Sequence, residues 1–247
     1  MKSVILCEGK DDLWFISYFL NKTSSWIVDN DVKNTWKLYR VSKSEDRNVL
    51  YIRLENENKY AAVLAVGGKD SFKDKLKKIL EINAQFPDDM IENIVLIRDC
   101  DTDQQSDILK EIASWFPGNI KLSNHKTSTY KMVVEEKERK VNFWPIIIPF
   151  NEEGALETVL LSAICEDGEE EAKIVKQAKN YVDEIKNECQ KYLSHEREIV
   201  KAKFSATIAI INPDHSTSLF KDIMLDHSWE ENKEVKKHYN FILSLIQ

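Results

Sequence analysis

The fold is decided at the start of the chain by the stretch Val4-Ile5-Leu6-Cys7-Glu8-Gly9-Lys10-Asp11-Asp12. An apolar run ends there in Glu-Gly, and residues 12–20 continue with apolar positions at helical spacing, with Asp11 or Asp12 as the N-cap. A buried strand that leads through a tight turn into a helix is typical of an α/β sheet.

The same alternation of strand and helix occurs twice more along the first half of the chain. Apolar runs at 60–66 and 93–97 are followed by helical patterns at 72–80 and 108–116. Strands without polar interruptions have to be covered on both faces. The sequence therefore predicts an α/β fold with a mostly parallel sheet flanked by helices.

The remaining segments add to this core. The polar stretch 36–57 predicts a hairpin insertion, and 130–135 and 141–148 predict a strand pair that reverses at 137–140. Helical patterns fill the C-terminal part of the chain, at 174–192, 204–211 and 230–246. We expect residues 1–160 to form the α/β core and residues 161–247 to form a helical extension packed on it.

Charge and composition narrow the functional classes. The 247-residue chain has 35 Lys and Arg against 42 Asp and Glu, a net charge of −7. Bulk attraction to nucleic acid is excluded, so such a ligand would need a local site, a metal ion or a partner. The four cysteines lack zinc-site spacing, and neither a membrane span nor a signal peptide is recognisable, so we expect a cytoplasmic protein without a membrane partner.

Acidic residues gather where the predicted strands end. Glu8 ends the first strand, Asp99 and Asp101 end the third, and Asp12 and Asp103 follow closely. The carboxyl ends of parallel strands meet at one edge of a sheet, and carboxylates packed there repel each other unless a cation neutralises them. Oxygen ligands favour Mg²⁺, or Mn²⁺ in its place. Lys10 and Lys69 are candidates for binding a phosphate, although lysines at such positions are more often solvated surface residues.

These motifs resemble a known family. The segment 4–12 is similar to the Glu-Gly signature of Toprim proteins, and Asp99-Cys100-Asp101 is similar to their DxD motif. The chain looks like the stand-alone Toprim-like proteins of the DUF3226 type, which are related to the Toprim domain of the overcoming-lysogenisation-defect (OLD) nucleases. Gly154-Ala155-Leu156-Glu157 is similar to a segment that supplies a further acid in the OLD-type site.

The resemblance implies a Toprim-like core and roles for the acids. Glu8, Asp99 and Asp101 would be catalytic and would also bind metal, and a second metal site would be completed by Asp12, Asp103 and Glu157. The implied activity is Mg²⁺-dependent cleavage of phosphodiesters in nucleic acid, with DNA favoured over RNA. The chain has no GxxxxGK[ST] loop, so an ATPase would have to be a separate partner, in phage defence or DNA metabolism. The oligomeric state is left open, including a homo-oligomer.

Two other functional classes compete with the nuclease hypothesis. The chain could be a non-catalytic acidic module that binds a protein partner, for example through an exposed surface at Trp229-Glu230-Glu231. A phosphoryl-accepting receiver domain also carries acids at its strand ends. The Glu-Gly turn after the first strand and the DxD after the third fit the Toprim pattern better than the receiver pattern.

Overall fold

The computed structural model describes residues 1–29, 48–55, 57–118, 120–189, 191–215 and 218–246. The chain forms two compact units. The first comprises Met1–Arg98, Gln104–Ile147 and Phe241–Gln247, and the second comprises Asp99–Asp103 and Ile148–Asn240. The predicted division at residues 160 and 161 remains a prediction.

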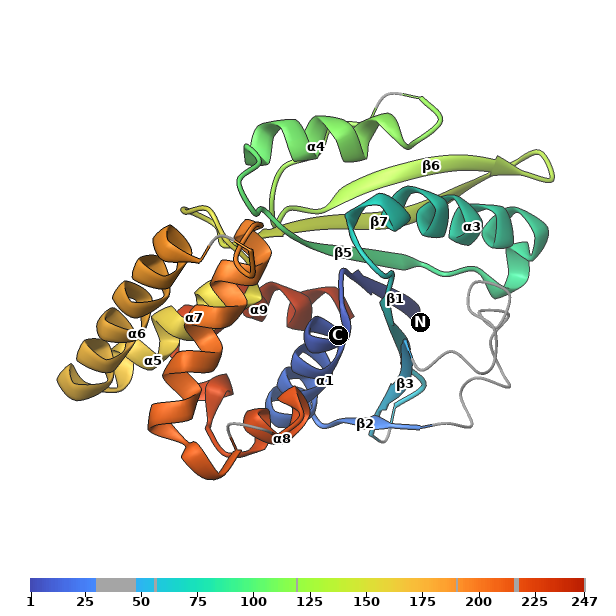
Figure 1. The fold of residues 1–247 in the computed structure, drawn as a ribbon. Helices are drawn as coiled ribbons and strands as arrows, with labels where there is room; N and C mark the ends of the chain where they lie inside the picture. The colour runs from blue at the N-terminus through green and yellow to red at the C-terminus, as the bar shows by residue number, and fades with distance from the viewer. Residues whose placement is uncertain (30–47, 56, 119, 190, 216–217, 247) are drawn as a thin grey trace. The chain divides into compact units, whose positions relative to one another are not determined.

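A mixed sheet forms the centre of the first unit (Figure 1). In the described residues it has seven strands, in the order β2 (Trp26–Val28), β3 (Val49–Leu54), β4 (Tyr60–Ala65), β1 (Lys2–Cys7), β5 (Asn93–Asp99), β7 (Lys137–Ile148) and β6 (Ser128–Val134). β1 is parallel to both β4 and β5, whereas β2–β3, β3–β4 and β6–β7 are antiparallel. The predicted α/β class is confirmed, with the parallel strands in the middle.

The three apolar runs found in the sequence are the three central strands. Leu6 of β1 pairs with Leu64 of β4 on one side and with Leu96 of β5 on the other, and all three side chains are buried. The middle of each strand is apolar because helices cover both faces of the sheet. Figure 1 shows α1 (Lys10–Ser24) on one side and α3 (Phe72–Gln85) and α4 (Gln105–Ser114) on the other. The chain leaves β1 through α1 toward β4, whereas α3 connects β4 to β5 in the opposite direction across the sheet, so right-handed connections put these two helices on opposite faces.

The hairpin predicted at 36–57 is described only in part. Residues 36–47 and 56 lie outside the described residues. The remainder contains β3, which pairs on its two sides with β2 and β4.

The reversal between β6 and β7 was predicted at the wrong residues. The chain turns at Glu135-Glu136, both with positive φ (51° and 63°), whereas Lys137 to Lys140 belong to β7. Two consecutive left-handed residues make the tight turn that matches the twist of a hairpin, so strand pairing extends further than the polar composition indicated.

The second unit is helical in most of its described part. Its helices are α5 (Leu156–Asp167), α6 (Glu169–Glu188), α7 (Glu196–Ile211), α8 (Phe220–Leu225) and most of α9 (Lys233–Ile246), with short 3₁₀ turns η4 (Pro213–His215) and η5 (Trp229–Glu231). The helices α5, α6 and α7 pack against one another. No helix in the described part of the chain is long and apolar enough to cross a membrane.

The expectation that Trp229 is exposed is wrong. The Trp229 side chain is only 1% exposed and its ring packs edge-on against the His227 ring, with 4.4 Å between centroids. Trp229 therefore belongs to the core of the helical unit.

Candidate functional site

In the first unit, Glu8 lies where β1 and β4 end together. The backbone N–H groups of Gly67 and Gly68, directly after β4, donate hydrogen bonds of 3.0 and 3.1 Å to the carbonyl oxygen of Glu8. Both glycines have positive φ (88° and 111°), a conformation that costs glycine little. The Gly-Gly turn therefore fixes the main chain at Glu8, whose side chain is half-buried.

Asp12 has a structural task in the same turn. Its buried carboxylate accepts a 2.9 Å hydrogen bond from the backbone N–H of Gly9, the residue that precedes α1. A carboxylate in the first helical turn also interacts favourably with the positive end of the helix. The predicted role of Asp12 as a metal ligand has to be compatible with this cap.

The two lysines considered as phosphate ligands, Lys10 and Lys69, are exposed. Lys10 is the first residue of α1, and Lys69 begins the 3₁₀ turn η2 (Lys69–Ser71) after the two glycines. Nothing in their surroundings identifies a bound phosphate, so their phosphate-binding role remains a prediction.

In the second unit, Asp99 lies against the start of α5. Its Oδ1 accepts a 3.1 Å hydrogen bond from the backbone N–H of Leu156, the first residue of that helix. The partial positive charge at a helix N-terminus stabilises a carboxylate placed there. The Gly-Ala-Leu-Glu segment noted in the sequence therefore meets the DxD motif directly.

Asp101 is fixed to the same segment through its main chain. Its N–H donates to the carbonyl oxygen of Gly154 at 2.7 Å, and the N–H of Gly154 donates back to the Asp101 carbonyl at 2.8 Å. Asp101 has a φ of 50°, which aspartate tolerates better than most residues. Gly154 has a φ of 140°, and a Cβ at this position would lie 2.2 Å from Oγ1 of Thr158. Only glycine fits where the two segments cross.

Carboxylates surround the thiol of Cys100. Burial raises the pKa of this thiol, and the negative charges of Asp101, Glu153 and Asp99 raise it further, although a backbone hydrogen bond with Gly154 acts in the opposite direction. Cys100 is thus kept protonated, and its Sγ lies 3.4 Å from the carbonyl oxygen of Glu152. The three acids act on one buried position, so their charges are concentrated in a small region. Asp103 closes the turn after them, with its N–H bonded to the Cys100 carbonyl at 2.9 Å.

Glu157 is the most deeply buried of the candidate acids in the second unit. Its side chain is 8% exposed, and its Oε1 lies 3.0 Å from Nζ of Lys201 on α7. The sequence reasoning missed Lys201, because it belongs to no motif and lies on an ordinary amphipathic helix. Lys203, two residues further along α7, forms an ion pair with Asp183 of α6 at 2.7 Å.

The structure therefore brings together only some of the acids that the sequence analysis predicted as metal ligands. Asp99, Asp101 and Asp103 lie on one turn in the second unit, and Asp99 contacts the helix that carries Glu157, whereas Glu8 and Asp12 belong to the first unit. Among the described residues, no group of three or more His, Cys, Asp or Glu side chains is arranged to hold a metal ion. The donors are all oxygens and suit Mg²⁺ chemically. Among these acids, Asp12 and Asp99 accept hydrogen bonds from backbone amides, and Glu157 forms an ion pair with Lys201.

Comparison with known proteins identifies a family that the sequence matches and a solved structure with a similar fold. Residues 2–247 match the family model described as "Protein of unknown function (DUF3226)". The crystal structure of the hypothetical protein PH0156 from Pyrococcus horikoshii OT3 is similar in fold, with a TM-score of 0.52 and 15% sequence identity over 98% of this chain and 99% of that chain. No curated protein matches the sequence.

Proposed function

We propose that this chain, which belongs to the DUF3226 family, is a Mg²⁺-dependent enzyme that cleaves phosphodiesters in nucleic acid, with DNA favoured over RNA. The proposal rests on the turn that carries Asp99, Asp101 and Asp103, called the acidic turn below. The relationship to the Toprim domain of OLD nucleases, inferred from the Glu-Gly and DxD motifs, is part of the same proposal. So are the cytoplasmic location, a separate ATPase partner and a role in phage defence or DNA metabolism.

One structural observation gives this proposal its main support. Asp99 and Asp101 flank the buried Cys100 in the sequence. Asp99 ends the central strand β5 and accepts a hydrogen bond from the first amide of α5, and the main chain of Asp101 is paired with that of Gly154. Concentrating negative charge next to a buried group is unfavourable unless a cation or a ligand is gained in return. Acidic turns fixed by their main chain, as Asp101 is by Gly154, have the preorganisation that a metal site needs.

In this proposal each part of the acidic turn has a role. Asp99 and Asp101 would hold the Mg²⁺ ion, which when bound would polarise a phosphate oxygen or activate a water molecule. Glu157 and Asp103 would be the neighbouring acids for a second ion, and Glu157 forms an ion pair with Lys201. Glu8 as proton-transfer residue and Asp12 as ligand remain predictions that rest on the sequence motifs.

The direct test is cleavage by the purified full-length chain. Supercoiled plasmid, single-stranded DNA and single-stranded RNA are incubated with the protein and Mg²⁺ or Mn²⁺, with EDTA as the metal-free control. The Asp99→Asn/Asp101→Asn variant should lose the activity. The matched variant Asp74→Asn/Asp214→Asn removes two exposed aspartates and should keep it.

The outcomes separate the two functional classes. Metal-dependent cleavage that disappears only in the Asp99/Asp101 variant supports the enzyme. Cleavage that is equal in all variants is due to a contaminating nuclease and contradicts the assignment. Absence of cleavage on every substrate, together with absence of metal binding, favours the alternative, a non-catalytic acidic module that binds a protein partner.

A further inference from the structure

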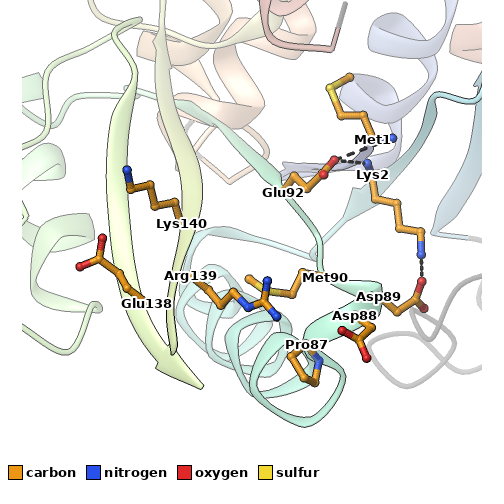
Figure 2. A pocket seen from close by; sticks show the side chains of 10 residues that line it. All are labelled: Met1, Lys2, Pro87, Asp88, Asp89, Met90, Glu92, Glu138, Arg139 and Lys140. Carbon is orange, nitrogen blue, oxygen red and sulfur yellow. Dashed lines mark hydrogen bonds and ion pairs between the residues drawn. The ribbon is translucent and has the colours of Figure 1, made fainter. Parts of the chain in front are cut away.

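A pocket of about 590 Å³ lies in the first unit, at the edge of the sheet where β1 and β5 begin (Figure 2). Its walls come from the first residues of β1, from the 3₁₀ turn η3 (Pro87–Asp89) with the following residues, and from the start of β7. A volume of several hundred cubic ångströms is in the range of small-molecule sites. The acidic turn of the proposed function contributes none of these residues.

Most of the charged side chains around this pocket already form ion pairs or hydrogen bonds within the protein. Lys2 forms an ion pair with Asp89 and donates its backbone N–H to Oε2 of Glu92 at 3.0 Å. Glu138 pairs with Lys131 on the neighbouring strand at 3.1 Å. These contacts use three of the four carboxylates in the lining, so their negative charge is largely compensated within the protein.

The charges that remain are Asp88, Arg139 and Lys140. Within the described residues their side chains form no ion pair. Of the two cations, only the guanidinium of Arg139 is directed toward the segment Pro87 to Met90 (Figure 2). A guanidinium that no carboxylate of the described residues pairs with can attract an anion.

Arg139 is the best placed of the three. Its Nε is shielded from solvent and has no hydrogen-bond partner among the described residues. Figure 2 shows its side chain reaching from β7 toward the segment Pro87 to Met90, whereas Lys140 points the other way. A buried N–H of a guanidinium is rarely left without an acceptor, so the position calls for an oxygen that the described residues do not provide.

We propose that this pocket binds a small organic anion, with a carboxylate or phosphate group held by the guanidinium of Arg139. The planar fork of arginine presents two parallel N–H groups to such an oxyanion. Met90 and Pro87 give the body of the ligand an apolar surface beside the charged group. The site is separate from the acidic turn and does not depend on the proposed function.

The test is isothermal titration of the full-length chain with inorganic phosphate and, separately, with benzoate, in a buffer free of both groups. Sodium chloride at equal ionic strength is the blank. The variant Arg139→Gln should bind the preferred probe about tenfold more weakly or worse, and Arg139→Lys should lie between it and the wild type. Arg197→Gln removes an exposed arginine on α7 and serves as the matched control.

A second readout follows the guanidinium itself. The Nε–H signal of Arg139 in a nitrogen-15 spectrum should shift on addition of the bound probe, and the unfolding midpoint of Arg139→Gln should confirm that this variant is folded. Equal affinity of wild type and Arg139→Gln, or no binding of either probe by the wild type, would overturn the proposal. The variant Asp99→Asn/Asp101→Asn should bind the probes as the wild type does, so failure of the metal site leaves this inference intact.

Discussion

The carboxylate of Glu157 and the ammonium of Lys201 lie 3.0 Å apart, joining α5 to α7 beside the acidic turn. Glu157 is nearly buried, whereas the side chain of Lys201 is 39% exposed. The lysine therefore compensates a carboxylate that has little access to water. Lys201 is thus a cation beside the acidic turn that the sequence motifs did not reveal.

Replacing Lys201 by Met should destabilise the second unit by about 1–3 kcal/mol, because it leaves a buried carboxylate without its counter-charge. The control Lys203→Met breaks a pair with an Asp183 that is 52% exposed and should cost less than about 1 kcal/mol. Urea unfolding measures both. Adding Glu157→Gln to Lys201→Met should restore part of the loss, and strictly additive effects would contradict the coupling.

Gly154→Ala should destabilise the protein by about 2–4 kcal/mol, because the new Cβ meets Thr158 and the backbone conformation is unfavourable for alanine. Gly154→Ala/Thr158→Ala should recover only the steric part. Gly118→Ala is the control for backbone strain alone, since Gly118 has a φ of 100° and open space around it, and about 1–2 kcal/mol is expected. Equal losses in Gly154→Ala and Gly118→Ala would show that the contact with Thr158 adds nothing to the cost of backbone strain.

The pH dependence of stability should include a contribution from His238. Its Nε2 accepts a hydrogen bond from the N–H of Phe150, its Nδ1 lies 2.7 Å from the Glu234 carbonyl oxygen, and burial lowers its pKa. The unfolded chain therefore takes up the proton first. The contribution of neutral His238 to the free energy of unfolding should be fully present above the ordinary histidine pKa of about 6.5. It should decrease as the pH falls below that value.

Urea midpoints measured across this range should fall more steeply for the wild type than for His238→Gln. His125 also has a pKa lowered by burial, so His125→Gln is the matched comparison and should remove a separate share of the pH dependence. Parallel curves for wild type and His238→Gln would contradict the neutral, buried assignment.

The thiol of Cys100 should react slowly with iodoacetamide, because burial and three nearby carboxylates keep it protonated. Cys189 is exposed and should react first. Mass spectrometry of the labelled peptides distinguishes the two positions. In Asp99→Asn/Asp101→Asn the labelling of Cys100 should accelerate at a given pH, and an unchanged rate would show that these carboxylates do not act on the thiol.

The central strands were predictable because burial on both faces favours a run of consecutive apolar residues in the middle of β1, β4 and β5. The hairpin turn was not, because Glu135 and Glu136 are unusual residues for a left-handed turn and carry no glycine signal. The resemblance to the OLD-type site implied only that Glu157 belongs with the other acids, and the contact of Asp99 with the first amide of α5 is a finding of the structure. Lys201 could not be found in this way, since a partner brought by tertiary packing leaves no local pattern in the sequence.

The acids of the second unit form a metal site in this account, and the most direct measurement is thermal unfolding with and without Mg²⁺ or Mn²⁺. At about 100 times the dissociation constant, a site specific to the folded chain adds about 2.7 kcal/mol, or roughly 5–10 °C in Tm for a chain of this size. We expect this metal-induced shift in the wild type and in Asp74→Asn/Asp214→Asn, and its loss in Asp99→Asn/Asp101→Asn. A shift of the same size in all three, or in none, would contradict the assignment of Asp99 and Asp101 as metal ligands.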